Sequence, residues 1–403
     1  MKKSPKVIQK FDFSWLKSPD VVAVFDALNS CGAKVFAVGG CVRNTVLGGL
    51  VEDIDLATDA VPEEVIESSR SANLNVILTG FDYGTITIVS GRRHFHVTTF
   101  RSDLSYNGRY PKVSFSKDIV KDASRRDFTI NAIYVTRSGE FLDPLSGWSD
   151  LINGHITFIG NPLKRIQEDH LRILRYFRFV ALHSGSGFEC DDSVLSMFSK
   201  ELTGLNRVSK ERIWYELKKI LAASRPLVSI TAMRKSKVLQ YLLPGAEVSQ
   251  FGQLLEKEKV LNLKPKFINR LISLNQDLVG TWIKDQPLMK KEKGEIATIL
   301  KILKDESSLP IKGFKFGELS TIDSILLSKK LSSGQVGNST LEEIRKGAEE
   351  RFPLSASEDF SKYSNPSRLL GNEVSRLKKL WLNSNFKLKR KELLAMIRDP
   401  NVL

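Results

Sequence analysis

The chain has 403 residues and a formal net charge of +15, a length that suits two or more domains and a charge that favours a polyanionic partner such as RNA or DNA. A hydrophobic fraction of 41% excludes wholesale disorder, and no apolar run reaches the length needed to span a bilayer. Three cysteines are too few for a disulfide framework or a zinc site, and the basic N-terminus lacks the apolar core of a secretory signal, so we expect a cytoplasmic protein.

The first 145 residues alternate short strands with short helices. β-branched runs that end at glycines predict strands over 34–40, 53–58, 75–80, 84–91 and 94–100. Between them, 41–49 and 61–72 have helical spacing, and the second segment has a proline at its start. The polar segment 101–115, with Asn107-Gly108 as a turn, is predicted to be a loop.

From about Leu151 the pattern becomes helical and strand signals disappear. Residues 165–184 predict one helix closed by the Ser-Gly pairs that follow, and 209–224 predict another with Ser209 at its start. From Phe251 onward 28 Lys and Arg stand against 19 Asp and Glu, so more than half of the excess charge lies there. We therefore expect an α+β fold, with a small mixed-sheet head followed by an elongated, all-helical and basic remainder.

Two carboxylates stand close together in the predicted strand 53–58. Residues i and i+2 of a strand point to the same face, so Asp53 and Asp55 would lie side by side. Such a pair suits Mg²⁺ bound with substrate phosphates, and two metals about 3.5–4 Å apart can clamp a phosphoryl displacement. The alternative is an exposed acidic pair without function. Asp59 falls after the strand and is predicted to cap the next helix.

A glycine pair leads into a short helix just before these carboxylates. Gly39-Gly40 would let the backbone approach a phosphate closely, and Arg43 in the first turn could fork onto a triphosphate. The segment fits neither a Walker loop nor a dinucleotide-binding fingerprint. A glycine turn followed by a surface arginine is the alternative.

Taken together in their order, these segments resemble a known family. The segment "GGCVRNTVLGGLVEDIDLATDA" is similar to the signature of the class II tRNA nucleotidyltransferases (CCA-adding enzymes) and bacterial poly(A) polymerases. Three further segments are similar to the four later motifs of that family: 122–135 to the second, 141–179 to the third and fourth, and 205–221 to the fifth. The resemblance covers about residues 33–221 and implies Mg-dependent nucleotidyl transfer to an RNA 3′ end.

The resemblance also implies roles for individual residues. It places Asp53 and Asp55 on Mg²⁺ as the catalytic pair, and a nucleotide-binding set of Gly39, Gly40, Arg43, Arg126, Glu168, Asp169, Arg172, Arg175 and Arg178. On a continuous helix 168, 169, 172 and 175 would form one polar stripe, which could present acceptor and donor to the edge of a base. The alternative is an ordinary ladder of ion pairs on a solvated helix. Four apolar residues of this segment are assigned to the core: Leu171, Leu174, Phe177 and Phe179.

Two positions bear on how closely the chain follows the family. His96 stands where relatives usually carry a Glu that is thought to be a third acidic group near the metals. A histidine there weakens the negative charge or binds metal as a neutral imidazole, unless it is simply a partly buried strand residue. In the predicted loop, Arg109 is the expected lever of a flexible segment that switches the site from C to A, and an ordinary solvated loop is the alternative.

The resemblance favours a CCA-adding enzyme that takes CTP and ATP and extends the 3′ end of tRNA, without contact to a membrane. The alternatives are a bacterial poly(A) polymerase, a relative that adds only CC or only A, and a catalytically inactive RNA-binding protein. The predicted division is a catalytic head (1–145), a neck with the base-reading helix (146–221), a body (222–300) and a basic, tRNA-binding tail (301–403). "KLKRKELL" at 387–394 is a candidate RNA contact within the tail.

Overall fold

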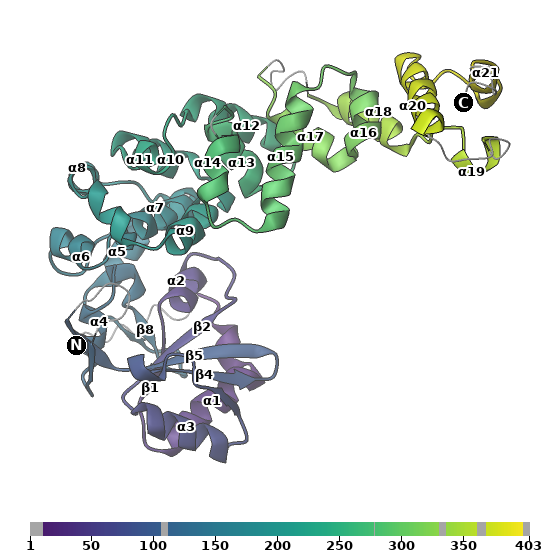
Figure 1. Cartoon of the computed structure of the whole chain (residues 1–403). Coiled ribbons are helices and arrows are strands. Elements are labelled where there is room, and N and C mark those ends of the chain that lie inside the picture. The colour runs from purple at the N-terminus through teal and green to yellow at the C-terminus, as the bar shows by residue number, and fades with distance from the viewer. Residues whose placement is uncertain (1–10, 106–111, 278, 330–335, 361–367, 398–403) are drawn as a thin grey trace. The chain divides into compact units, whose positions relative to one another are not determined.

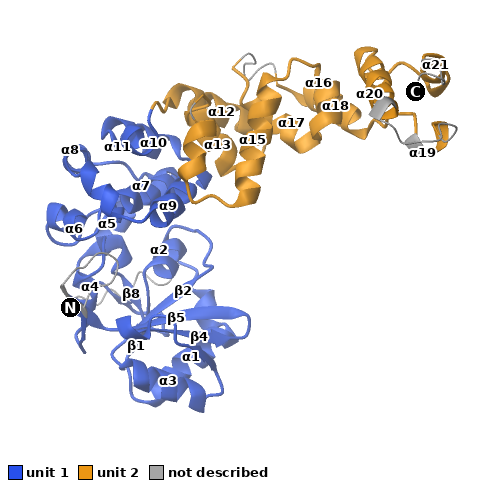
Figure 2. Cartoon of the chain, in the orientation of Figure 1, with its two compact units in different colours: residues 1–244 blue, residues 245–403 orange. Residues whose placement is uncertain are grey.

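The structure is a computed structural model that describes residues 11–105, 112–277, 279–329, 336–360 and 368–397. The chain divides into two compact units, residues 1–244 and residues 245–403 (Figure 2). All strands of the described residues belong to the first unit, and the described part of the second has only helices as regular elements. The prediction of a mixed-sheet head followed by helices is therefore confirmed, while the four-part functional division remains a prediction.

A seven-stranded sheet forms the centre of the head (Figure 1). Its strands, in spatial order, are β3 (Asn75–Ile77), β4 (Thr85–Ser90), β5 (Arg93–Thr99), β2 (Ile54–Thr58), β1 (Val35–Val38), β8 (Tyr134–Val135) and β9 (Phe141–Leu142). β2 and β5 run parallel, and the other neighbouring pairs are antiparallel. Five of these strands lie where the sequence predicts strands, and only the two short strands β8 and β9 were not expected.

Alternation along the central strands places Phe95 and Asp55 on opposite faces of the sheet. Ile54 and Ile88 flank Phe95 in register, and all three side chains are buried. One residue further along, Asp55 lies beside His96, which is exposed and lies beside Thr87. Because side chains alternate between faces, Asp55 lies on the opposite face from Phe95, beside Val38 and Ala57 of a second buried apolar cluster.

Two helices of the head pack against the sheet. α1 (Pro19–Ser30) and α3 (Pro62–Ser71) contact each other and β4, and lie together beside the sheet in Figure 1. The predicted capping role of Asp59 is wrong, because its Oδ1 accepts the N–H of Lys34 at 2.7 Å while Val61 precedes α3. On the path between β1 and β2, α2 (Gly40–Val46) begins at the glycine pair.

The prediction of a loop over residues 101–115 is wrong at both ends of that segment. β6 (Arg101–Ser105) and β7 (Lys112–Phe115) pair antiparallel and form a separate two-stranded sheet. Both strands are polar, so the sequence shows no alternating apolar pattern for them. The backbone hydrogen bonds between them define the pair. The predicted turn at Asn107-Gly108 lies outside the described residues, and so does Arg109.

Helices complete the first unit. They are α4 (Ile119–Ser124), α5 (Gly147–Asn153), α6 (Pro162–Glu168), α7 (Leu171–His183), α8 (Asp192–Lys200), α9 (Lys210–Ala222), α10 (Leu227–Lys235) and α11 (Val238–Leu242). α7 packs against both α9 and α10, and aromatic rings such as Phe128, Tyr176 and Phe198 are buried around it. As predicted, Ser209 caps α9, since its side chain accepts the N–H of Arg212.

The single helix predicted over 165–184 is wrong. Between α6 and α7, Asp169 has an extended backbone, with φ −152° and ψ 102°. Its Oδ1 accepts the N–H of Leu171 at 3.1 Å, a local bond that competes with continuation of the helix. Glu168 therefore belongs to α6 and Arg172 to α7, so the predicted stripe on one helix does not exist.

The second unit consists of helices that pack through an apolar interior. They are α12 (Val248–Val260), α13 (Phe267–Leu274), α14 (Val279–Trp282), α15 (Lys290–Lys304), α16 (Leu309–Phe316), α17 (Glu318–Leu326), α18 (Asn338–Glu349), α19 (Ala356–Asp359), α20 (Arg368–Asn383) and α21 (Arg390–Ala395). α16 and α18 approach so closely that a Cβ on Gly347 would lie 2.0 Å from the carbonyl oxygen of Pro310. Near the C-terminal end, Trp381 and Leu377 are buried in a cluster with Phe360. Across the described ranges, none of the helices combines the length and the apolar character that a membrane span requires.

Candidate active site

A cavity of about 810 Å³ in the first unit gathers most of the predicted site residues. Those that line it are Gly39, Gly40, Arg43, Asp53, Asp55, Arg126, Asp169, Arg172, Arg175 and Arg178. Glu168 does not line the cavity, but its Oε2 accepts a hydrogen bond from Arg172 Nη1 at 2.6 Å. The fold thus brings residues of α2 and β2 together with residues of α7 and the α6–α7 junction, more than a hundred residues later in the chain.

The glycine pair forms a tight turn at one edge of this cavity. Gly39 has φ 76° and ψ −123°, a conformation that L side chains rarely adopt. A Cβ at this position would lie 3.8 Å from Arg126 Nη1 and 4.0 Å from Asp55 Oδ2. The absent side chain therefore leaves the backbone open beside an acidic and a basic group, as the approach of a phosphate requires.

The two aspartates differ in their surroundings. Asp53 is exposed and directly precedes β2, whereas Asp55 lies within the strand between Val38 of β1 and His96 of β5. Burial raises the pKa of the Asp55 carboxyl, and the nearby charges of Arg126 and His96 partly oppose that rise. A cation between the two carboxylates would favour the ionised form of Asp55.

The donor chemistry of the aspartate pair suits a hard divalent cation. The described residues contain no group of three or more His, Cys, Asp or Glu side chains arranged to hold a metal. A site of two carboxylate residues is completed by water and substrate phosphate oxygens, which is how Mg²⁺ is commonly bound in phosphoryl-transfer sites. Asp53 and Asp55 fit that pattern. The described residues offer no set of ligands that would hold a metal through protein groups alone.

A chain of hydrogen bonds connects Arg43 on α2 with Arg175 on α7. Arg43 Nη1 donates to Asn131 Oδ1, and Asn131 Nδ2 donates to Asp127 Oδ1 at 2.9 Å. The other carboxylate oxygen of Asp127 accepts from Arg175 Nε at 2.6 Å. Although burial raises the pKa of Asp127, Arg175 and these hydrogen bonds lower it well below its usual range. Two arginines of the cavity are therefore held in place by one buried, ionised carboxylate.

The ring of Phe179 supports three of the arginines. The guanidinium carbons of Arg43 and Arg178 each lie 4.7 Å from the ring centroid, and that of Arg175 lies 5.6 Å from it. Burial and the neighbouring charge of Arg178 lower the pKa of Arg43 to about 10. Phe179 is buried as predicted, but it also lines the cavity. Cations crowded in this way, on an apolar support, form a site for a multiply charged anion.

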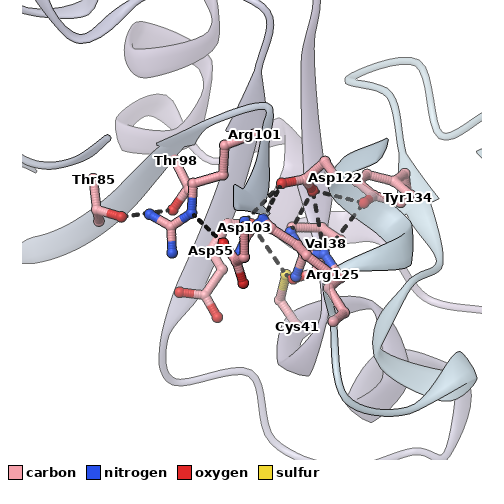
Figure 3. A network of polar contacts seen from close by, with 11 residues as sticks. Val38, Cys41, Asp55, Thr85, Thr98, Arg101, Asp103, Asp122, Arg125 and Tyr134 are labelled. Carbon is pink, nitrogen blue, oxygen red and sulfur yellow. Dashed lines mark hydrogen bonds and ion pairs between the residues drawn. The ribbon is translucent and has the colours of Figure 1, made fainter. Parts of the chain in front are cut away.

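A second carboxylate fixes the arginines that follow α4 (Figure 3). Asp122 is fully buried and accepts from Arg125 Nη2 at 2.6 Å, Arg126 Nη2 at 2.9 Å and the Tyr134 hydroxyl at 2.7 Å. Burial opposes its charge, but Arg126 and Arg125 outweigh that effect and lower the pKa of Asp122 to about 2. Arg126 is thus oriented towards the cavity by a carboxylate beneath it.

Side chains from three helices meet where base recognition is predicted. Arg212 Nη2 of α9 donates to Asp169 Oδ2 at 2.7 Å. Arg172 Nη1 donates to the carbonyl oxygen of Arg165 and to Glu168 Oε2, both at 2.6 Å. Asp169 and Arg172 are therefore each fixed by their own partners, and they offer an acceptor and a donor to the same cavity, although not from a shared helix.

Several residues of the site were missed by the sequence reasoning. Those that line the cavity are Arg101, Asp127, Asn131 and Arg212, and Glu216 lies behind it with Oε2 2.9 Å from Arg178 Nε. Asp127 and Asn131 stand within the second family motif, and Arg212 and Glu216 stand four residues apart in the fifth. That (i, i+4) spacing of an arginine and a glutamate was available as a signal, but it was used only to predict a helix.

Comparison with known proteins gives consistent matches. Residues 35–157 match the family described as "Poly A polymerase head domain", and residues 187–249 match "Probable RNA and SrmB- binding site of polymerase A". The "CCA tRNA nucleotidyltransferase 1, mitochondrial" of Mus musculus is 30% identical over 401 residues, which are 95% of this chain and 92% of the mouse protein. The protein of the same name from Homo sapiens is 32% identical over 372 residues, 89% of this chain and 85% of its own length. The crystal structure of the Bacillus stearothermophilus CCA-adding enzyme in complex with CTP has the same fold, with a TM-score of 0.74 at 21% identity, over 96% of this chain and 98% of that one.

Proposed function

Because this chain belongs to the CCA tRNA nucleotidyltransferase family, we propose that it adds C, C and A to the 3′ end of tRNA from CTP and ATP without a template. The main observation in support is that the aspartate pair, the arginine cluster and the residues Asp169 and Arg172 all line the same cavity. Each group matches one part of a nucleoside triphosphate: the reacting phosphorus, the phosphate tail and the base. The enzyme is a transferase that acts on RNA, and an inactive RNA-binding protein would have no use for Asp53 and Asp55.

The reaction joins the RNA 3′ oxygen to the α-phosphorus of the nucleotide, breaks the bond from that phosphorus to the bridging oxygen, and releases pyrophosphate. The hydroxyl proton passes to solvent. Members of this family depend on a divalent metal, and we assign Mg²⁺ to Asp53 and Asp55 here. When bound, the metal supplies charge neutralisation at the attacking and leaving oxygens. The protein residues position the reactants and form no covalent intermediate with them.

The triphosphate is assigned to the glycine turn and its neighbouring arginines. The open backbone at Gly39 and Gly40 lies beside Arg126, and Arg43 lies one helical turn further along α2. Asp122 and Asn131 hold these two guanidinium groups in fixed orientations. Preorganised donors of this kind stabilise developing charge without having to reorient during the reaction.

Base selection is assigned to Asp169 and Arg172. A carboxylate accepts a hydrogen bond from the exocyclic amine of C or A, and a guanidinium donates to the ring nitrogen beside it. U and G present the opposite pattern, a carbonyl oxygen and a ring N–H, so both contacts would fail for them. Glu168 does not reach the cavity, and we propose that it acts by orienting Arg172 through their 2.6 Å hydrogen bond.

The remaining assignments rest on the family. We propose that the helical residues 222–403 bind the body of the tRNA through their basic surface, with the four-part division predicted from the sequence. Arg109, which lies outside the described residues, remains the proposed lever of the C-to-A switch. A cytoplasmic location also remains a prediction, since the mouse and human relatives are named as mitochondrial proteins.

A direct assay is incorporation from CTP alone into a tRNA that lacks its three terminal nucleotides. We expect addition of two C residues and then arrest, because ATP is absent. A chain that incorporates no C but extends the same RNA with ATP is a poly(A) polymerase and not a CCA-adding enzyme. Asp53→Ala in parallel should show no incorporation, which excludes a contaminating activity.

A further inference from the structure

Arg101 lines the cavity wall, and the assignments above give it no role. It is the first residue of β6, and its side chain is only 13% exposed. Its Nε and Nη1 atoms are buried, and no hydrogen bond of the described residues uses either of them. The nearest carboxylate oxygen, Asp103 Oδ1, lies 3.8 Å from Nε, beyond hydrogen-bond distance.

Burial makes the unused N–H groups of Arg101 costly, although Asp103 lies within ion-pair distance. Burial and the nearby charge of Arg125 lower the pKa of Arg101 to about 10, and Asp103 and Asp122 only partly oppose that fall. By contrast, Arg125 and Arg126 each bond directly to Asp122. A buried guanidinium with unused N–H groups that faces a cavity is a site for an oxyanion, and the oxyanions of this reaction are phosphates.

The order of the strands indicates which of the reacting phosphates would lie near Arg101. Asp55 lies on β2 between β1, which leads into the Gly39 turn, and β5, which leads into Arg101. Figure 3 shows Arg101 and Cys41, the latter from α2, on opposite sides of Asp55. The triphosphate, assigned to the α2 side, therefore leaves the β5 side open.

In phosphoryl transfer the attacking and leaving oxygens lie roughly in line on opposite sides of the reacting phosphorus. With pyrophosphate leaving on the α2 side, the RNA 3′ oxygen must approach from the β5 side. We propose that Arg101 binds the phosphodiester that joins the last two nucleotides of the acceptor RNA and so positions the attacking 3′ hydroxyl. This inference rests on the proposed function, since it takes the acceptor to be an RNA 3′ end.

The test combines a protein change with a chemical change in the RNA. Wild type and Arg101→Met are titrated, without nucleotide, with an RNA hairpin that ends in a single-stranded 3′ tail, in native form and with a neutral methylphosphonate at the terminal linkage. We expect Arg101→Met to weaken binding of the native RNA about tenfold, the effect of one lost charge-assisted contact, and to make no difference to binding of the neutral RNA. The slope of log affinity against log salt for the native RNA should fall by about one.

Two controls and a second ligand separate the possible outcomes. Arg93→Met removes an exposed arginine of β5 that pairs with Asp20, and it should leave every titration unchanged. CTP affinity, measured by equilibrium dialysis without RNA, should be the same for wild type and Arg101→Met. Loss of CTP affinity with intact RNA binding would assign Arg101 to the triphosphate and overturn the proposal. Equal losses for native and neutral RNA, or no loss at all, would overturn it too.

If Arg101→Met does not fold, as judged by its thermal unfolding, Arg101→Lys replaces it. Lysine keeps the positive charge but lacks the two parallel N–H donors of a guanidinium. We therefore expect about threefold weaker binding of the native RNA, with an unchanged dependence on salt. Wild-type affinity for this variant would contradict the proposal. Incorporation of C by the wild-type enzyme is assayed alongside, so that a failure of the proposed function is distinguished from a failure of this inference.

Discussion

Arg212 Nη2 lies 2.7 Å from Asp169 Oδ2, and Arg212 Nη1 lies 3.4 Å from Asp169 Oδ1. This pair joins α9 to the break between α6 and α7, and Asp169 Oδ1 also accepts the N–H of Leu171. The carboxylate is therefore fixed from two directions, with remaining lone pairs available to a base in the cavity. An acceptor fixed in this way is what discrimination between an amine and a carbonyl oxygen requires.

Removing this support should reduce base selectivity more than it reduces catalysis. For Arg212→Met we expect the ratio of kcat/KM for CTP to that for UTP to fall by about tenfold, the size expected from one weakened polar contact. Arg212→Lys, which keeps the charge, should lose less. The measurement is single-nucleotide incorporation from each triphosphate into the same tRNA. An unchanged ratio, with both rates lowered equally, would mean that Arg212 only stabilises the fold.

The aspartate pair should be essential for transfer but not for RNA binding. Asp53→Asn and Asp55→Asn keep the shape of each side chain and remove one negative charge. We expect the rate of C addition to fall at least about a thousandfold for each, because the metal would lose an ionised ligand. tRNA affinity, measured by filter binding without nucleotide, should change less than about twofold. Substantial transfer by either variant would contradict the metal assignment.

The Asp122 cluster makes a prediction about stability against pH. Its pKa is lowered in the folded protein from 3.8 to about 2, so the folded state holds fewer protons than the unfolded state between these values. The stabilisation is therefore complete above the unfolded pKa and is lost as pH falls through the folded one. We expect the free energy of unfolding of wild type to exceed that of Asp122→Asn by a constant amount above pH 5. That difference should shrink by about 2 kcal/mol between pH 4 and pH 2.

Urea denaturation of both proteins at a series of pH values measures this difference. Asp192→Asn is a control from the same unit: its exposed carboxylate pairs with the exposed Lys235, and because such surface pairs contribute little, we expect this variant to follow wild type closely across the pH series. A difference between wild type and Asp122→Asn that stays constant down to pH 2 would show that Asp122 is not held ionised by its arginines.

How much of this site could be predicted from the sequence depends on how local each signal is. The strand 53–58 and the turn at Gly39 were predicted because alternation and glycine chemistry act within a few residues. The break at Asp169 was not, because the helical spacing continues through it and the competing partner, Arg212, stands 43 residues away. β6 was missed for a related reason, since it is defined by backbone hydrogen bonds to β7 and has no alternating apolar pattern that the sequence could show.

The arginine cluster shows the same limit for the site. Arg43 and Arg126 were predicted from the motifs that contain them, yet nothing local indicates that Asn131 and Asp122 orient them. Arg101 Nε and Nη1 are buried and have no hydrogen-bond partner among the described residues, although Asp103 lies 3.8 Å away, and a sequence cannot show this. Contacts between distant segments decide these roles, and only the fold reveals them.

The basic second unit should make tRNA binding strongly dependent on salt. Release of counterions from six to ten phosphates lowers affinity by about 10³ to 10⁵ between 50 and 200 mM salt. Lys387 and Lys391 are exposed in the predicted contact segment, whereas Arg390 pairs with Asp359. Replacing both lysines with glutamine should lower the slope of log affinity against log salt by about two. Filter binding across a salt series measures the slope, and an unchanged slope would remove this segment from the RNA interface.

The central claim is that one cavity selects C and then A and adds them to an RNA end. The most direct measurement is the sequence of the product formed from a tRNA that lacks its terminus when CTP and ATP are supplied together. The structure and the family predict C, C and A, followed by arrest, with two C residues from CTP alone and no extension from ATP alone. A run of A residues, or addition that continues beyond the third nucleotide, would contradict the account.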